Sequence, residues 1–194
     1  MFSKINLFGA IIALITLLSG PLTAQENDTS GPWIEIEALN TGLPPPDGTL
    51  RHASPRELME SFLDLADAED FEGAAHLLNL NRLSPADQAA FGATLAAQLA
   101  SVIERQVWIS WSQLPVRPDA LVEASSRDHP LAGQPRESIE INVFEVANRA
   151  RDIRIQRVRI ADQDPVWVFT ERTVANIPPL FDVYGPRWFE HYLP

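Results

Sequence analysis

The sequence predicts an α+β fold in which N-terminal helices pack on an antiparallel meander of three to four strands. Two segments, at Ser54 and Ser84, carry the same helix-start signature: a serine, then a proline, and an acidic side chain three residues after the serine. After residue 106 the spacing of the apolar residues changes from helical to alternating. Short turns then separate three alternating segments, which is the pattern of an antiparallel meander.

Residues 1–24 are expected to be a secretory signal peptide. Lys4 precedes an apolar run from Leu7 to Leu18, and small residues around Ala24 suit a cleavage site. As a helix the run would span about 18 Å, which is well short of a bilayer core of about 30 Å. An uncleaved anchor is the alternative, and export to the periplasm is favoured.

Composition limits the functions open to the chain. The 194 residues include no cysteine, which excludes disulfides, thiol nucleophiles, thiolate zinc sites and an N-terminal lipid anchor. The formal net charge of −11 repels nucleic acid, because binding to nucleic acid depends on neutralising its phosphates. We therefore expect no nucleic-acid partner. Residues 54–194 are long enough to form a single α+β domain with its own core.

Residues 25–53 are expected to form an extended N-terminal segment. Apolar and acidic residues alternate within 33–39, which predicts a short strand. Three consecutive prolines, Pro44 to Pro46, follow in "NTGLPPPDGTL". Because proline donates no backbone hydrogen bond, this stretch is expected to be a connector rather than a helix or a strand.

Three helices are predicted next, with caps at Ser54, Asp70 and Ser84. The first places Leu58 and Phe62 at helical spacing, and the second is short. The third is the longest and is expected to bury one apolar stripe. That stripe consists of Phe91, Leu95, Leu99, Val102 and Ile103.

Three strands are predicted in "SIEINVFEV", "RDIRIQRVRI" and "PVWVFT". In the middle segment the alternation slips, because Ile153 and Ile155 share one face whereas Val158 and Ile160 share the other. A β-bulge near Arg157 would reconcile the two halves.

The segment after the third strand is expected to lead away from the core. Trp167 and Phe169 alternate with valines, which predicts that both aromatic rings are buried. A short helix is predicted to start near Thr173. Pro178 and Pro179 are expected to end it, because they cannot donate helical hydrogen bonds.

Four stretches carry a family resemblance: "WIEIEALNTGLPPP", "ESFLDLADAEDFEGAAHLLNL", "LAAQLASVIERQVWISWSQLPVRPDAL" and "PVWVFTERTVANIPPLFDVYGP". Together they resemble the N-terminal periplasmic domain of large bacterial mechanosensitive ion channels of the MscS-like type. The part from Trp167 to Pro179 is the most specific, and the likeness covers nearly the whole chain after residue 24.

The resemblance implies a non-catalytic domain that caps, assembles or regulates a channel, with channel subunits or the membrane surface as partners. In such channels membrane helices and the channel module follow this domain. No run of about 20 apolar residues follows Ala24. We therefore expect the domain to be truncated or to act in trans. Residues 178–194 would form a juxtamembrane-like tail with an aromatic and proline-rich strut, built from Pro178, Pro179, Tyr184, Pro186 and Trp188.

Two other functions are weighed against this one. The first is a free-standing periplasmic module that binds a small molecule or a protein. It would have a lumazine-binding or nuclear-transport-factor-like fold and a pocket between the helices and the concave sheet face. The second is a hydrolase, yet the chain has no G-x-S-x-G, S-x-x-K, Walker or G-x-G-x-x-G motif. We therefore expect neither enzymatic activity nor a cofactor.

No metal site is expected either. The four histidines show no i,i+4 pair, and they are His52, His76, His129 and His191. The acidic residues between Asp64 and Glu72 lack the spacing of a calcium loop, and helix caps explain them.

Arginines concentrate on the middle strand and the turn before it. Strand alternation places Arg157 and Arg159 on one face, with Arg149 and Arg151, and places Arg154 on the other. They could form a patch for anionic headgroups or an acidic partner. The favoured alternative is a solvated face paired with the protein's own carboxylates.

Overall fold

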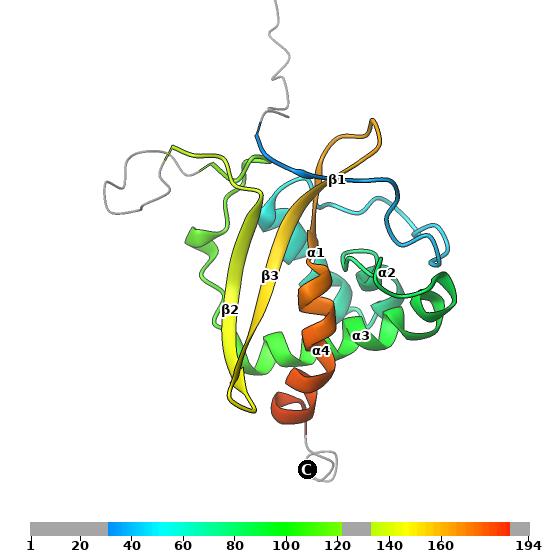
Figure 1. Cartoon of the computed structure of the whole chain (residues 1–194), viewed down its shortest axis with the longest axis vertical. Helices are drawn as coiled ribbons and strands as arrows, with labels where there is room; N and C mark the ends of the chain where they lie inside the picture. Colours follow the sequence, from blue (N-terminus) through cyan, green and yellow to red (C-terminus); the bar gives the residue numbers. More distant parts are fainter. Residues whose placement is uncertain (1–30, 122–132, 187–194) are drawn as a thin grey trace, which may run out of the picture.

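The computed structural model describes residues 31–121 and 133–186 (Figure 1). Along the chain, helices come first and most strands afterwards, which confirms the predicted α+β class. The signal peptide (1–24), Trp188, His129 and His191 lie outside the described residues. The elements are β1 (Ile34–Ile36), α1 (Pro55–Asp67), α2 (Phe71–Ala75), α3 (Pro85–Gln106), the 3-10 turn η1 (Trp111–Gln113), β2 (Ser138–Val146), β3 (Arg149–Ile160), β4 (Val166–Phe169) and α4 (Glu171–Tyr184).

Side-chain caps set the helix starts where the sequence predicts them. Ser54, Asp70 and Ser84 each accept a hydrogen bond from the backbone N–H three residues later, at 2.8–3.2 Å. Each bond satisfies one of the N–H groups that a helix start leaves without a partner. Thr170 caps α4 in the same way, at 3.0 Å, so this helix begins before the expected Thr173.

Pro178 and Pro179 lie inside α4, so the prediction that they end a short helix is wrong. The helix continues to Tyr184 and ends before Gly185. Each proline removes one helical N–H donor, which weakens the helix locally. Burial of one helix face offsets this loss, because Ile177 and Leu180 are both fully buried. The first residues of the expected tail therefore belong to the folded unit.

Strand β3 is central, and the other three strands all pair with it. β2 and β4 pair with it antiparallel, as the meander predicts, whereas β1 pairs parallel and makes the sheet mixed. β2 and β1 lie along the same edge of β3, β2 at residues 149–156 and β1 at residues 158–160. β4 takes the other edge, at residues 155–158, because Ile155 and Val158 each pair with β4 on one side and with another strand on the opposite side.

The irregularity expected near Arg157 lies in β2 instead. The register between β2 and β3 shifts between Glu140 and Asn142. In β3 the alternation is regular, but Arg157 and Val158 are both fully buried although they point to opposite faces. Both faces of β3 are thus covered at this end, so the apolar pattern does not mark a bulge there.

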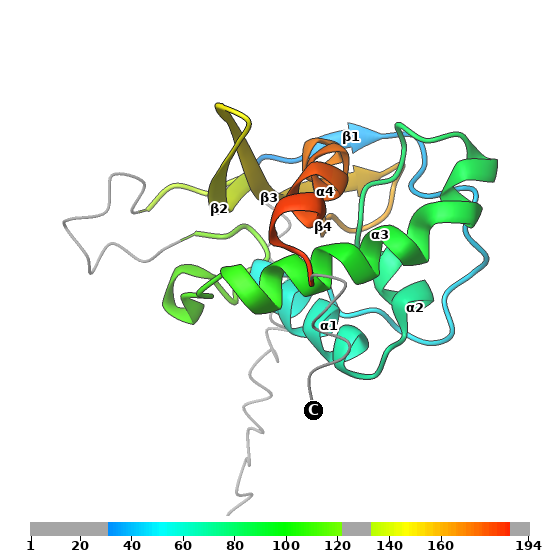
Figure 2. The ribbon, with the colours of Figure 1, turned by 90° about the horizontal axis from the view of Figure 1, so that it is seen from below.

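In the view of Figure 2, helix α3 lies between two groups of elements, although α1 also contacts β4 directly. The sheet and α4 lie on one side of it, and α1 and α2 on the other. Phe62 of α1 and Phe169 of β4 meet edge to face, with their ring centroids 4.9 Å apart. Trp167 is also fully buried, and its indole N–H donates to the carbonyl oxygen of Pro118 at 2.8 Å. The prediction that both β4 aromatics are core residues is therefore confirmed.

The predicted stripe of α3 is wrong at its first position. Phe91 is 53% exposed, whereas the buried face of this half of the helix runs through Gln88, Gly92 and Ala96. An added Cβ at Gly92 would lie 3.2–3.3 Å from three neighbouring side chains. Close approach of the chain at Gly92 turns Phe91 outward, and spacing of large apolar residues does not reveal such an approach.

Candidate functional site: a groove between α1 and α3

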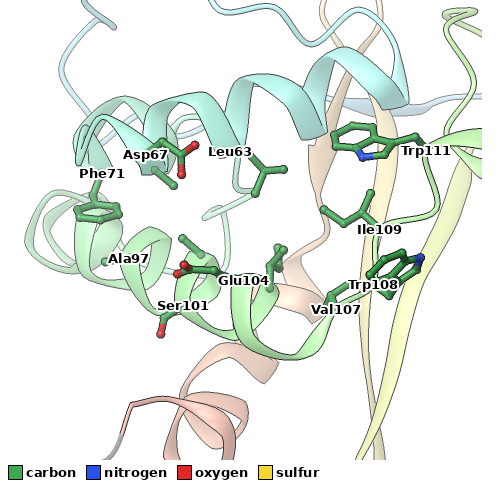
Figure 3. A pocket seen from close by; sticks show the side chains of 13 residues that line it. Leu63, Asp67, Phe71, Ala97, Ser101, Glu104, Val107, Trp108, Ile109 and Trp111 are labelled. Carbon is green, nitrogen blue, oxygen red and sulfur yellow. The ribbon is translucent and has the colours of Figure 1, made fainter. Parts of the chain in front are cut away.

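A hollow of about 510 Å³ lies between α1 and α3 and is bounded at one end by residues 107–111 (Figure 3). Its size falls within the roughly 300–1,000 Å³ that is usual for small-molecule sites. Most of the residues around it are apolar, including Leu63, Phe71 and Ile103. We call this hollow the α1–α3 groove.

Two tryptophans flank one end of the groove. Trp108 is 94% exposed and Trp111 is 39% exposed. Burying a large apolar side chain stabilises a protein by about 1.5–3 kcal/mol. Because these two indoles are exposed, they contribute only part of that stabilisation to the fold. Exposed apolar side chains that gather beside a hollow are typical of interaction sites.

Arg56 of α1 fixes the segment that carries these indoles. Its guanidinium donates to the carbonyl oxygens of Trp111 at 2.6 Å and of Leu114 at 3.2 Å. Its backbone N–H donates to the carbonyl oxygen of Pro115 at 3.3 Å, and the Leu114 side chain is buried in the core. The segment is thus anchored at Trp111, Leu114 and Pro115, and the backbone at Trp111 is held in place.

The charged groups that line the groove are acidic. Asp67 lies on the α1 wall beside Phe71, and Glu104 lies on the α3 wall, with Ser101 near it (Figure 3). Both carboxylates are exposed. None of the described residues that line the groove is basic. The groove therefore presents apolar walls together with negative charge.

The pocket expected between the helices and the concave sheet face is not where the groove lies. Core side chains fill that interface, as the contact between Phe62 and Phe169 shows. A second hollow, of about 380 Å³, lies between Pro44–Pro46 and α2 and includes His76. It is also remote from the sheet face.

The structure does not gather the predicted arginines into one exposed patch. Arg154 forms ion pairs with Glu140 at 2.8 Å and with Asp152 at 3.1 Å. Arg159 pairs with Glu35. These two arginines thus neutralise the protein's own carboxylates, as the favoured alternative expects.

Arg157 corrects the expectation of a surface position. It is fully buried, and its guanidinium carbon lies 5.7 Å from the ring centroid of Trp33. Trp33 also covers Arg159, at 4.6 Å. The N-terminal segment therefore lies over the sheet face that the sequence predicts to be solvated.

Three of the predicted strut residues, Pro178, Pro179 and Tyr184, belong to α4. Pro178 and Pro179 are helical, and the ring of Tyr184 packs against Phe144 with centroids 5.1 Å apart. The Tyr184 hydroxyl donates to the carbonyl oxygen of Glu145 at 3.3 Å. These contacts attach the end of α4 to the hairpin of β2 and β3.

The two described histidines, His52 and His76, are packed against other parts of the fold. His52 Nδ1 lies 3.1 Å from the carbonyl oxygen of Trp167, and burial lowers the pKa of His52. His76 follows α2, and burial likewise lowers the pKa of its side chain. Within residues 31–121 and 133–186, no three His, Asp or Glu side chains come together as a metal site. None of the described helices is long and apolar enough to cross a membrane.

Sequence reasoning did not identify the α1–α3 groove. A signal was present, because "VWISW" places two tryptophans within four residues directly after a long capped helix. Nothing in the spacing shows, however, that α1 packs beside that helix. Comparisons of the chain with protein-family models, with curated proteins and with solved structures found no match.

Proposed function

We propose that the folded unit is a non-catalytic extracytoplasmic domain that regulates or assembles a mechanosensitive channel of the MscS-like type, either within a longer chain or in trans. The observation that carries this proposal is the attachment of α4. The stretch with the most specific resemblance forms β4 and most of α4, and side chains of α4 tie it to the central strand of the sheet.

This attachment completes the edge of β3. Thr173 Oγ1 accepts a hydrogen bond from the Arg154 N–H at 2.8 Å and donates to the Arg154 carbonyl oxygen at 2.9 Å. Asn176 Nδ2 donates to the Asp152 carbonyl oxygen at 3.0 Å. The α4 side chains thus take the place of a neighbouring strand just where β4 ends.

An ion cluster strengthens the same junction. The buried carboxylate of Asp152 pairs with Arg154 at 3.1 Å and with Arg172 of α4 at 2.8 Å. Burial by itself would raise the pKa of Asp152, but the hydrogen bond from Arg154 and the charges of both arginines hold it below its ordinary value. A helix attached in this way moves with the sheet, as a domain that transmits force or a binding event to the following residues requires.

Two measurements test the proposal. The DNA that follows the codon of Pro194 should encode, in the same or an adjacent frame, apolar segments of about 20 residues. Patch-clamp recording from spheroplasts that carry this channel should then show a shifted opening pressure when residues 31–186 are deleted. A locus without a membrane protein, or an unchanged opening pressure, would contradict the proposal.

The second candidate is a free-standing periplasmic binding module, and the α1–α3 groove is the observation that favours it. Osmotic shock separates the two candidates. A module that works alone should be released completely with the periplasmic proteins, whereas a channel-regulating domain should remain with the membrane fraction.

A further inference from the structure

The α1–α3 groove combines three features that single out one class of ligand. Its walls are apolar, Trp108 and Trp111 stand at one end, and the carboxylates of Asp67 and Glu104 stand along the remaining length (Figure 3). We propose that the groove binds an organic cation with an apolar body, such as an alkylammonium compound. This inference goes beyond the proposed function and does not depend on it.

The apolar walls act on the body of such a ligand, and the indoles and the carboxylates act on its positive charge. The apolar walls remove the ligand body from water, which stabilises the complex in proportion to the area buried. An indole face attracts a cation through the quadrupole of the ring, and tryptophan is the best aromatic residue for this contact. The carboxylates add attraction for the positive head group.

The same groove disfavours an anionic ligand. Its described lining holds two carboxylates and no basic residue, so a ligand carboxylate or sulfate would gain no ion pair there. The formal net charge of the chain, −11, adds a long-range bias in the same direction. A neutral ligand would keep the apolar contacts but lose the electrostatic ones. Affinity should therefore fall in the order cation, neutral molecule, anion.

The geometry of the indoles suits a ligand that enters from solvent. Trp108 is 94% exposed, so little protein covers its faces, and a ligand can reach them without opening the fold. Arg56 holds the backbone at Trp111 through a hydrogen bond of 2.6 Å, so little ordering accompanies binding.

The test uses the full mature protein and three probes with the same alkyl chain: octyltrimethylammonium, octanol and octanoate. Isothermal titration calorimetry gives their dissociation constants, and tryptophan fluorescence reports contact with the indoles. We expect octyltrimethylammonium to bind several times more tightly than octanol, and octanoate to bind least. Equal affinities for the three probes, or tightest binding of octanoate, would overturn the proposal.

Two variants and two matched controls locate the site. Trp108→Ala should weaken octyltrimethylammonium binding about fivefold. Glu104→Gln should weaken it about threefold and leave octanol binding unchanged. Phe91→Ala removes an exposed ring from α3 outside the groove, and Glu37→Gln removes an exposed carboxylate elsewhere. Both controls should bind like the wild type. A loss of affinity as large in the controls as in Trp108→Ala and Glu104→Gln would place binding outside the groove.

Discussion

The hydroxyl group of Thr173 provides a direct test of how α4 is attached to the sheet. Thr173 is fully buried, and its Oγ1 accepts from the Arg154 N–H at 2.8 Å and donates to the Arg154 carbonyl oxygen at 2.9 Å. Thr173→Val keeps the size and branching of the side chain and removes only the hydrogen-bonding group. The variant therefore isolates the polar contact from the packing.

The magnitude follows from which groups lose their partners. The Arg154 carbonyl oxygen still accepts from the Thr170 N–H at 3.0 Å, but the Arg154 N–H loses its acceptor, and the Thr170 hydroxyl loses its contact with Thr173 Oγ1 at 3.0 Å. A net hydrogen bond contributes about 0.5–1.5 kcal/mol, and a buried donor left without a partner costs about 1–3 kcal/mol. We expect the free energy of unfolding to fall by about 2 kcal/mol. For a domain of this size the Tm should fall by about 4–8 °C.

Urea unfolding followed by circular dichroism measures this change, and Thr173→Ser is the matched control. Serine keeps the hydroxyl and loses one methyl group, which lowers the free energy of unfolding by about 1 kcal/mol. Thr173→Val should therefore be the less stable of the two variants. If Thr173→Ser proved equally or less stable, packing rather than the hydrogen bonds would hold α4, and the reasoning would be refuted.

Three further predictions concern charged groups. The pKa of Asp152 is lowered in the folded state, so its carboxylate stabilises the fold above the ordinary pKa of 3.8, and this stabilisation is lost as the pH falls below that value. The wild type should therefore unfold at a lower urea concentration at about pH 3.5 than at about pH 7, and Asp152→Asn should show a smaller difference between these two urea midpoints. The pKa of His52 is also lowered in the folded state, so protonation of His52 favours the unfolded chain as the pH falls through 6.5. Between about pH 7 and about pH 5, the free energy of unfolding should therefore fall less in His52→Gln than in the wild type. Arg56→Lys should speed amide hydrogen exchange in residues 107–114, since a lysine cannot reproduce the fork that now donates to Trp111 and Leu114.

Features fixed by short-range interactions could be predicted from the sequence. A helix cap joins residues three positions apart, so a short sequence pattern is enough to predict the caps at Ser54, Asp70 and Ser84. The same holds for the alternation of β2 and β4, which marks a half-buried or buried strand. The fold class follows from the order of these local elements.

Features that depend on partners far along the chain could not be predicted. β1 pairs with a strand more than 100 residues later, and its parallel direction has no signal in "WIEIEAL". Arg157 is buried because Trp33 and its neighbours cover β3, and a strand pattern alone predicts an arginine at the surface. The low helix propensity of proline is likewise a local rule, and it predicts that a helix ends at Pro178 and Pro179. In α4 the burial of Ile177 and Leu180 outweighs this preference.

The groove and the attachment of α4 lie on opposite sides of one element, α3. Ala97 and Ser101 line the groove, whereas Leu99 and Val102 are fully buried in the core, and α3 also packs against α4. A ligand in the groove contacts α3, and any shift of α3 would involve the whole helix, because a capped helix of 22 residues moves as a body rather than one residue at a time. Any effect of the ligand on α4 must then pass through the packing of α3. Enlarging Ala97 should therefore alter ligand affinity directly, because Ala97 lines the groove, and should change the stability of the α4 junction only as far as it displaces α3. Thr173→Val should lower the stability of the α4 junction and leave ligand affinity unchanged, because Thr173 does not line the groove.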